Sequence, residues 1–210
     1  MTSHLAFLKA ALLPPIPFRG TILASIPWFL QDLSTYGIGI FTPTILATAL
    51  GHKNQGYNLA AIIFNDMLAA KGAAILDMLL IGGIIFAILL TDKVGRIKLQ
   101  IIGFIGCAVG LAVTALSLRF SGTEHLVMLF SGFMLFNFMT NLGPNPQTYL
   151  ISGEVFPTHI RGKGAGLAAS FAKMGAVSTA FLFPIFLKNI GTPILLTMLV
   201  FTSLLGALIT

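Results

Sequence analysis

Long apolar runs dominate this sequence and leave few folds open to it. Only 9% of its 210 residues are Asp, Glu, Lys or Arg, whereas a soluble domain carries roughly 25%. A helix needs about 20 apolar residues to cross a bilayer, so a chain of this length has room for about six crossings. The 18 Phe residues and the aliphatic runs also exclude a disordered chain. We therefore expect most of the chain to lie in a membrane.

Six of these runs predict membrane-spanning helices. Lipid leaves the backbone no hydrogen-bond partner outside a helix or a closed barrel, and the continuous runs lack the alternation of barrel strands. The predicted fold is an all-α membrane protein, a six-transmembrane-helix bundle that follows a cytoplasmic N-terminal segment at residues 1–20. The predicted spans of the domain at 21–210 are 21–50, 73–90, 99–118, 126–151, 164–187 and 192–210.

Basic residues in the loops orient the predicted bundle. The side that holds the N-terminus carries Lys9, Arg19, Lys93, Arg96, Lys98, Arg161 and Lys163. The other side carries Lys53, Lys71, Arg119 and Lys188. Because Lys and Arg accumulate in cytoplasmic loops, we expect a cytoplasmic N-terminus and an external loop at 51–72. The net charge of +6 then reflects these loops, and no nucleic-acid partner is expected.

Two charged residues interrupt the apolar runs near the middle of a span. Asp32 lies in the first span and Lys173 in the fifth. A charge at the bilayer centre costs about 2.5–3.5 kcal/mol on insertion scales and usually marks a functional site. Both spans start from the same side, so the two side chains could pair or share an anionic substrate and a proton. The alternative is a structural ion pair, and Asp77, near the outer end of its span, is assigned a structural role.

Polar side chains accompany Asp32 on its predicted helix. Trp28, Asp32 and Tyr36 recur every four residues and therefore share one helical face. Their indole N–H, carboxyl and phenol groups could all contact a polar ligand in a cavity. The alternative places Trp28 in an interfacial belt and leaves Tyr36 as a packing residue.

The fourth predicted span contains helix breakers and amides. The breakers are Gly143, Pro144 and Pro146, and they must break or kink the helix. Irregular backbone at membrane depth is tolerated where it is buried in protein or lines a cavity. The amides of this span are Asn137, Asn141, Asn145 and Gln147. We expect Asn145 and Gln147 to contact a ligand, although amides can also simply hold helices together.

Two charged turns lie on the predicted cytoplasmic side. The first contains Asp92, Gly95 and Arg96. The second contains Glu154, Pro157 and Arg161. Such charges could latch helix ends in one conformation and release them in another.

Residues needed for enzyme chemistry are missing from the sequence. It has no Gly-x-Gly-Asp of an aspartyl intramembrane protease, no Gly-x-Ser-Gly of a serine protease and no His/Cys cluster with metal-site spacing. We therefore expect no enzyme, no bound metal and no cofactor.

Together these motifs resemble the C-terminal half, helices seven to twelve, of a major facilitator superfamily transporter, a 3+3 inverted repeat. Asp92-x-x-Gly95-Arg96 resembles the superfamily signature between helices eight and nine. Glu154-x-x-Pro157-x-x-x-Arg161 resembles the signature after helix ten. The stretches 141–145, 153–158 and 172–176 are similar to the phosphate:proton symporter branch in particular, and sugar porters are also close.

The resemblance carries expectations about function. Five positions match those that surround phosphate in that branch: Trp28, Asp32, Tyr36, Asn145 and Lys173. It implies proton-coupled uptake of inorganic phosphate or another small anion across the cell membrane, with the charged turns acting as cytoplasmic gates. We expect Asp32 to accept the proton and Lys173 to supply positive charge to the anion. The resemblance also implies a second six-helix half, either a separate chain or a second copy. The alternatives are a sugar or organic-acid porter of the same superfamily and a truncated, non-transporting membrane protein.

Overall fold

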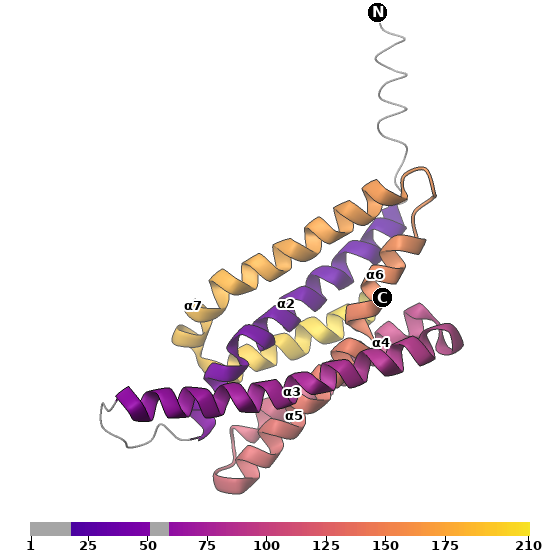
Figure 1. Ribbon diagram of the computed structural model, residues 1–210. Helices are drawn as coiled ribbons and strands as arrows, with labels where there is room; N and C mark the ends of the chain where they lie inside the picture. Colours follow the sequence, from indigo (N-terminus) through magenta and orange to yellow (C-terminus); the bar gives the residue numbers. More distant parts are fainter. Residues whose placement is uncertain (1–17, 51–58) are drawn as a thin grey trace, which may run out of the picture.

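The computed structural model describes residues 18–50 and 59–210, and these residues form helices and short turns without a strand (Figure 1). This confirms the predicted all-α class. The predicted N-terminal segment lies outside the described residues up to residue 17. The helices are α2 (Phe18–Leu50), α3 (Leu59–Val94), α4 (Arg96–Ser117), α5 (Gly122–Leu142), α6 (Pro144–Glu154) and α7 (Arg161–Ile209).

Helix α7 consists of two legs that meet at Gly191. Gly191 has φ 79° and ψ 166° inside the range Arg161–Ile209, and a positive φ is open to glycine because it has no Cβ. The first leg (161–190) and the second leg (192–209) turn back on each other and both lie beside α2 (Figure 1). The predicted fifth and sixth spans therefore correspond to one helix with a sharp kink.

The predicted break in the fourth span lies at Gly143. This residue has φ −116° and ψ −90° and separates α5 from α6. Pro144 and Pro146 have no N–H, so they cannot continue the hydrogen bonds of α5 into α6. The described residues thus form six rods, which are α2, α3, α4, α5 with α6, and the two legs of α7.

Four helices in the described part of the chain are long and apolar enough to cross a membrane. They are α3 from Met67, α4, the continuous rod of α5 and α6, and α7 with both legs. The protein is therefore a multi-pass membrane protein by its helices. One boundary differs from prediction, because α3 begins at Leu59, inside the stretch 51–72 that was predicted as a loop. A helix satisfies its own backbone, so it can continue beyond the apolar segment that marks its membrane-crossing part.

Small residues allow the rods to approach closely. A Cβ on Gly110 of α4 would lie 2.8 Å from the carbonyl oxygen of Gly132 on α5. A Cβ on Gly175 of α7 would lie 2.5 Å from the carbonyl oxygen of Phe29 on α2. Such contacts are typical of helix packing in membranes, where dispersion replaces the hydrophobic effect. The second contact brings the polar face of α2 against the leg of α7 that carries Lys173.

Candidate functional site

Lys173 forms an ion pair with Asp32 inside the bundle. Its Nζ donates to Asp32 Oδ2 over 2.9 Å and to the Tyr36 hydroxyl over 3.3 Å. The same Nζ lies 5.0 Å from the centre of the Tyr36 ring. Asp32 and Tyr36 reach one ammonium because they lie one turn apart on α2. The structure thus brings together three of the five residues that the sequence analysis singled out.

The two partners of this ion pair differ sharply in exposure. The side chain of Asp32 is 4% exposed, whereas that of Lys173 is 53% exposed. Asp32 is covered where α2 and the first leg of α7 approach each other. A carboxylate buried in this way needs a charged partner to offset its lost hydration. The ammonium supplies that charge, and it belongs to a side chain that is itself half exposed.

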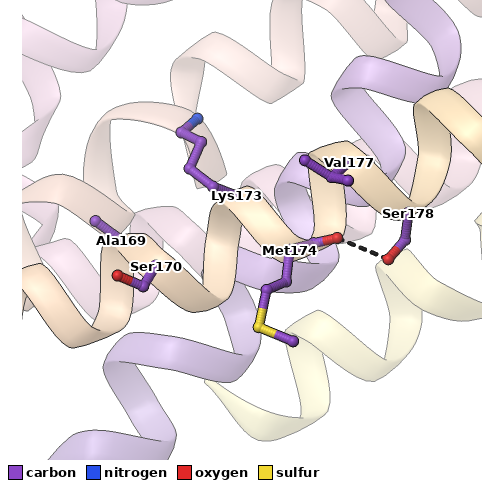
Figure 2. Close-up of a pocket in the computed structure, with 6 residues that line it drawn as sticks. All are labelled: Ala169, Ser170, Lys173, Met174, Val177 and Ser178. Carbon is purple, nitrogen blue, oxygen red and sulfur yellow. Dashed lines mark hydrogen bonds between the residues drawn. The ribbon is translucent and has the colours of Figure 1, made fainter.

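A groove of about 620 Å³ runs along the first leg of α7 beside Lys173. Its lining residues are Ala169, Ser170, Lys173, Met174, Val177 and Ser178. Figure 2 shows Lys173 extending from the helix on the side opposite Met174, and Ser178 donating to the Met174 carbonyl, over 2.7 Å. Lys173 is the only charged residue of this lining, and its charge is balanced by Asp32.

Trp28 lies apart from the ion pair. Its side chain is buried, and its ring centre lies 4.4 Å from that of Tyr149 on α6, with an angle of 61° between the planes. Its Nε1 is buried without a hydrogen-bond partner among the described residues. Tyr149 was not predicted as a site residue. The sequence signal that could have identified Tyr149 is its position four residues after Asn145, on the same face of α6.

Asn145 joins the site through Gln31. Gln31 Nε2 donates to Asn145 Oδ1 over 3.4 Å, and Asn145 Nδ2 donates to Asn141 Oδ1 over 2.6 Å. Gln31 precedes Asp32 in sequence but lies on another face of α2, so Asn145 contacts the neighbour of the ion pair and not the pair itself. Gln147 lies elsewhere, because its Nε2 donates to Thr91 Oγ1 over 2.8 Å and ties α6 to α3.

Arg96 organises the two charged turns. Its guanidinium lies 3.1 Å from Asp92 Oδ1 and 3.1 Å from Glu154 Oε1, so it joins the turn between α3 and α4 to the end of α6. Gly95, with φ 93°, makes the tight turn that places Arg96 there. Arg161 does not share in these pairs and instead donates from Nε to the Phe156 carbonyl over 3.4 Å, across the turn that contains Pro157.

The sequence of this chain matches a known protein family. Residues 19–210 match the family model described as "Sugar (and other) transporter". The chain belongs to this family. It is a family of the major facilitator superfamily, and its members are transporters.

Several relatives of this chain are named as phosphate transporters or permeases. The chain is 29% identical over 187 residues to "Probable inorganic phosphate transporter 1-6" of Arabidopsis thaliana, covering 87% of this chain and 36% of the relative. It is 29% identical over 155 residues to "Repressible high-affinity phosphate permease" of Neurospora crassa, covering 73% of this chain and 26% of the relative. The chain therefore spans about a third of the length of these relatives or less.

Proposed function

We propose that this chain is the six-helix half of a secondary transporter that takes up inorganic phosphate or another small anion together with protons. The observation that carries the proposal is the half-exposed side chain of Lys173, whose ammonium is held by a buried carboxylate and a phenol inside a membrane bundle. The phosphate-transporter names of the relatives support the choice of anion. The site would lie in the cell membrane, with the Arg96 end of the bundle in the cytoplasm.

In the proposed mechanism, the Lys173 ammonium exchanges its partner, the Asp32 carboxylate, for the anionic substrate. With Asp32 ionised, the 2.9 Å contact neutralises the ammonium, and an anion has little to gain by binding. When Asp32 takes up a proton, the ammonium is left with its charge free for phosphate, and the neutral carboxyl can donate a hydrogen bond to a phosphate oxygen. Loss of that proton restores the ion pair and expels the anion, so the two fluxes are coupled.

The neighbouring polar groups would orient the substrate. Tyr36 can turn its hydroxyl from Lys173 toward a bound phosphate, since that contact is the longer of the two at 3.3 Å. The nearby donors are the Asn145 amide and Trp28 Nε1, which has no hydrogen-bond partner among the described residues. A second six-helix half would close the groove on α7 and rock against this one to give alternating access.

The test is uptake of radiolabelled phosphate by proteoliposomes. They should contain the chain alone, or together with the six-helix half of a related phosphate transporter. We expect uptake driven by an inward proton gradient and abolished by a protonophore in at least one of the two preparations. Asp32→Asn should eliminate gradient-driven uptake while phosphate exchange without a gradient remains. Gradient-driven uptake by Asp32→Asn equal to wild type would exclude Asp32 as the coupling residue.

Competition experiments separate the proposal from its alternatives. Excess arsenate should suppress phosphate uptake, whereas glucose and small carboxylates should leave it unchanged. Suppression by glucose would instead support a sugar porter, in keeping with the family description. A chain that is folded by circular dichroism but takes up none of these solutes in either preparation would support a non-transporting membrane protein.

A further inference from the structure

Asp77 is a second carboxylate in the apolar part of the bundle, and the proposed mechanism does not use it. It lies on α3 within the membrane-crossing segment Met67–Val94. Its side chain is exposed on the outside of the bundle, and its Oδ1 accepts a hydrogen bond from Asn137 Nδ2 of α5 over 3.4 Å. None of the ion pairs among the described residues includes Asp77. A charge so placed is costly in lipid, which makes a purely structural role unsatisfactory.

Three asparagines lie between Asp77 and the neighbourhood of the ion pair, and we call them the amide ladder, although no hydrogen bond among the described residues joins its first member, Asn137, to the second, Asn141. Asn137, Asn141 and Asn145 are spaced by four residues and lie on one face of the rod formed by α5 and α6. Asn141 Nδ2 donates to the Leu80 carbonyl over 2.9 Å, and Asn145 donates to Asn141 over 2.6 Å. Gln31 Nε2, beside Asp32 in sequence, closes the ladder on Asn145 over 3.4 Å.

No ion pair among the described residues joins Asp77 to the charged side chains of its own helix or of the neighbouring helices. On α3 itself the described side chains of this kind are Lys71, Asp92 and Lys93. On the helices that contact α3 they are Arg19, Asp32, Tyr36, Arg96, Lys98, Cys107, Glu124, His125, Tyr149 and Glu154. The strong pairs among them are already formed elsewhere, at Asp32 with Lys173 and at Arg96 with Asp92 and Glu154.

We propose that Asp77 is a proton-binding site that positions the amide ladder during coupled transport. As a carboxylate, Asp77 only accepts, and it holds Asn137 by its N–H. As a carboxylic acid, it can donate its O–H to Asn137 Oδ1, which lets the Asn137 amide turn over. Binding of one proton thus reverses the hydrogen bond between Asp77 and Asn137 and frees the Asn137 N–H groups to turn toward Asn141, one helical turn away. From Asn141 the hydrogen bonds continue through Asn145 to Gln31. The proposal rests on the proposed function, with Asp32 as the residue that touches substrate and Asp77 acting through Asn137.

The decisive variant is Asp77→Asn, which keeps the shape of the protonated carboxyl and cannot titrate. In the proteoliposome assay we expect phosphate exchange without a gradient to stay within about twofold of wild type. The ratio of uptake from acidic medium to uptake from alkaline medium should fall by about fivefold or more, a typical size for coupling between sites. Glu124→Gln, which neutralises an exposed carboxylate at the start of α5, is the matched control and should keep the wild-type ratio.

A structural role would give a different pattern. If Asp77 only held α3 against α5, Asp77→Asn would lower exchange and gradient-driven uptake by the same factor, and that result would overturn the proposal, as would an unchanged uptake ratio. Asn137→Leu leaves Asp77 in place but removes the first rung of the ladder, so it should lower the uptake ratio as Asp77→Asn does. An unchanged ratio in Asn137→Leu would exclude the ladder as the route.

Infrared spectroscopy tests the proton site without relying on transport. The difference spectrum between acidic and alkaline medium should contain a carboxylic-acid band that is missing in Asp77→Asn and present in Asp32→Asn. If the band shows this pattern but the preparation takes up no phosphate, the proton site at Asp77 is supported and only the proposed function is refuted. Absence of such a band in the wild-type chain would refute the proton site, whatever the uptake.

Discussion

The bundle contains two sets of ion pairs that use similar groups in opposite surroundings. Lys173 meets a carboxylate that is 4% exposed, between two closely packed helices. Arg96 meets Asp92 and Glu154, whose side chains are 84% and 54% exposed, at one end of the bundle. Heavy-atom distances barely differ, at 2.9 Å and 3.1 Å. The difference lies in what happens when a partner is withdrawn.

The burial of the carboxylate determines what happens when its partner is withdrawn. An exposed carboxylate that loses its partner is solvated by water, so the pair contributes little and can open and close readily. A buried carboxylate has no such substitute and must be protonated or paired again. The Arg96 pairs therefore suit a latch between helix ends, and the Lys173 pair suits chemistry in which a proton and an anion compete for two partners.

Lys173→Met should have the largest effect. It leaves Asp32 buried without a cation, which should lower the free energy of unfolding by about 1–3 kcal/mol, less than for a fully buried pair because Lys173 is half exposed. Phosphate uptake should be undetectable. The double variant Lys173→Met with Asp32→Leu should regain most of the stability, measured in mixed detergent micelles, but no uptake. Recovery of uptake in the double variant would mean that the pair only holds helices together.

Gly175→Ala should separate the two helices that form the buried pair. The added Cβ would lie 2.5 Å from the Phe29 carbonyl oxygen, and such overpacking costs about 1–3 kcal/mol. Gly166→Ala is the matched control on the same helix, because its Cβ would meet no atom within 4 Å. The control should be neutral or stabilising by about 0.5–1 kcal/mol. Equal unfolding free energies for the two variants would contradict the close approach of α2 and α7.

Tyr36→Phe should weaken phosphate binding without disrupting the ion pair. It removes the hydroxyl that accepts from Lys173 over 3.3 Å and leaves the ion pair intact. A hydrogen bond of this kind contributes about 0.5–1.5 kcal/mol, so the concentration for half-maximal phosphate uptake should rise by about two- to tenfold. Tyr149→Phe, on the far side of Trp28, serves as the comparison and should have a smaller effect. The reverse order would place the substrate at Tyr149.

Arg96→Gln should have the smallest effect on stability. It breaks both exposed pairs, and exposed pairs each contribute about 0–1 kcal/mol. The free energy of unfolding should therefore change by less than Lys173→Met changes it, and added salt should remove part of the difference. Glu154→Gln, which breaks only one of the pairs, should fall between Arg96→Gln and wild type. A loss as large as that of Lys173→Met would show that burial does not separate the two regions.

Residue spacing anticipated part of the site. The four-residue interval between Asp32 and Tyr36 guarantees one helical face, and a single buried acid and a lysine at similar positions in parallel rods suggested a pair. The break at Gly143 also followed from local chemistry, because Pro144 and Pro146 cannot donate. These predictions depend on features within one helix, which periodicity and backbone hydrogen bonding determine.

Features that depend on packing between helices could not be predicted in the same way. Trp28 shares the face of Asp32 by spacing, yet it packs on Tyr149 because α6 lies on that side of α2. Asn145 is linked to the site through Gln31, a relation set by the rotation of α6 after the break. The start of α3 at Leu59 was missed because hydropathy reports where lipid can contact a helix, not where its backbone begins.

Because the Lys173 side chain is much more exposed than that of Asp32, the site has an accessible side that carries the lysine and a buried side that carries the carboxylate. A solute that approaches the groove on α7 meets the ammonium first, and the carboxylate lies behind it. In the proposed transport, Lys173 would act as an electrostatic shield, because an arriving anion would feel the nearby positive charge before the repulsion of Asp32. In this way a carboxylate can lie close to a negatively charged solute without repelling it.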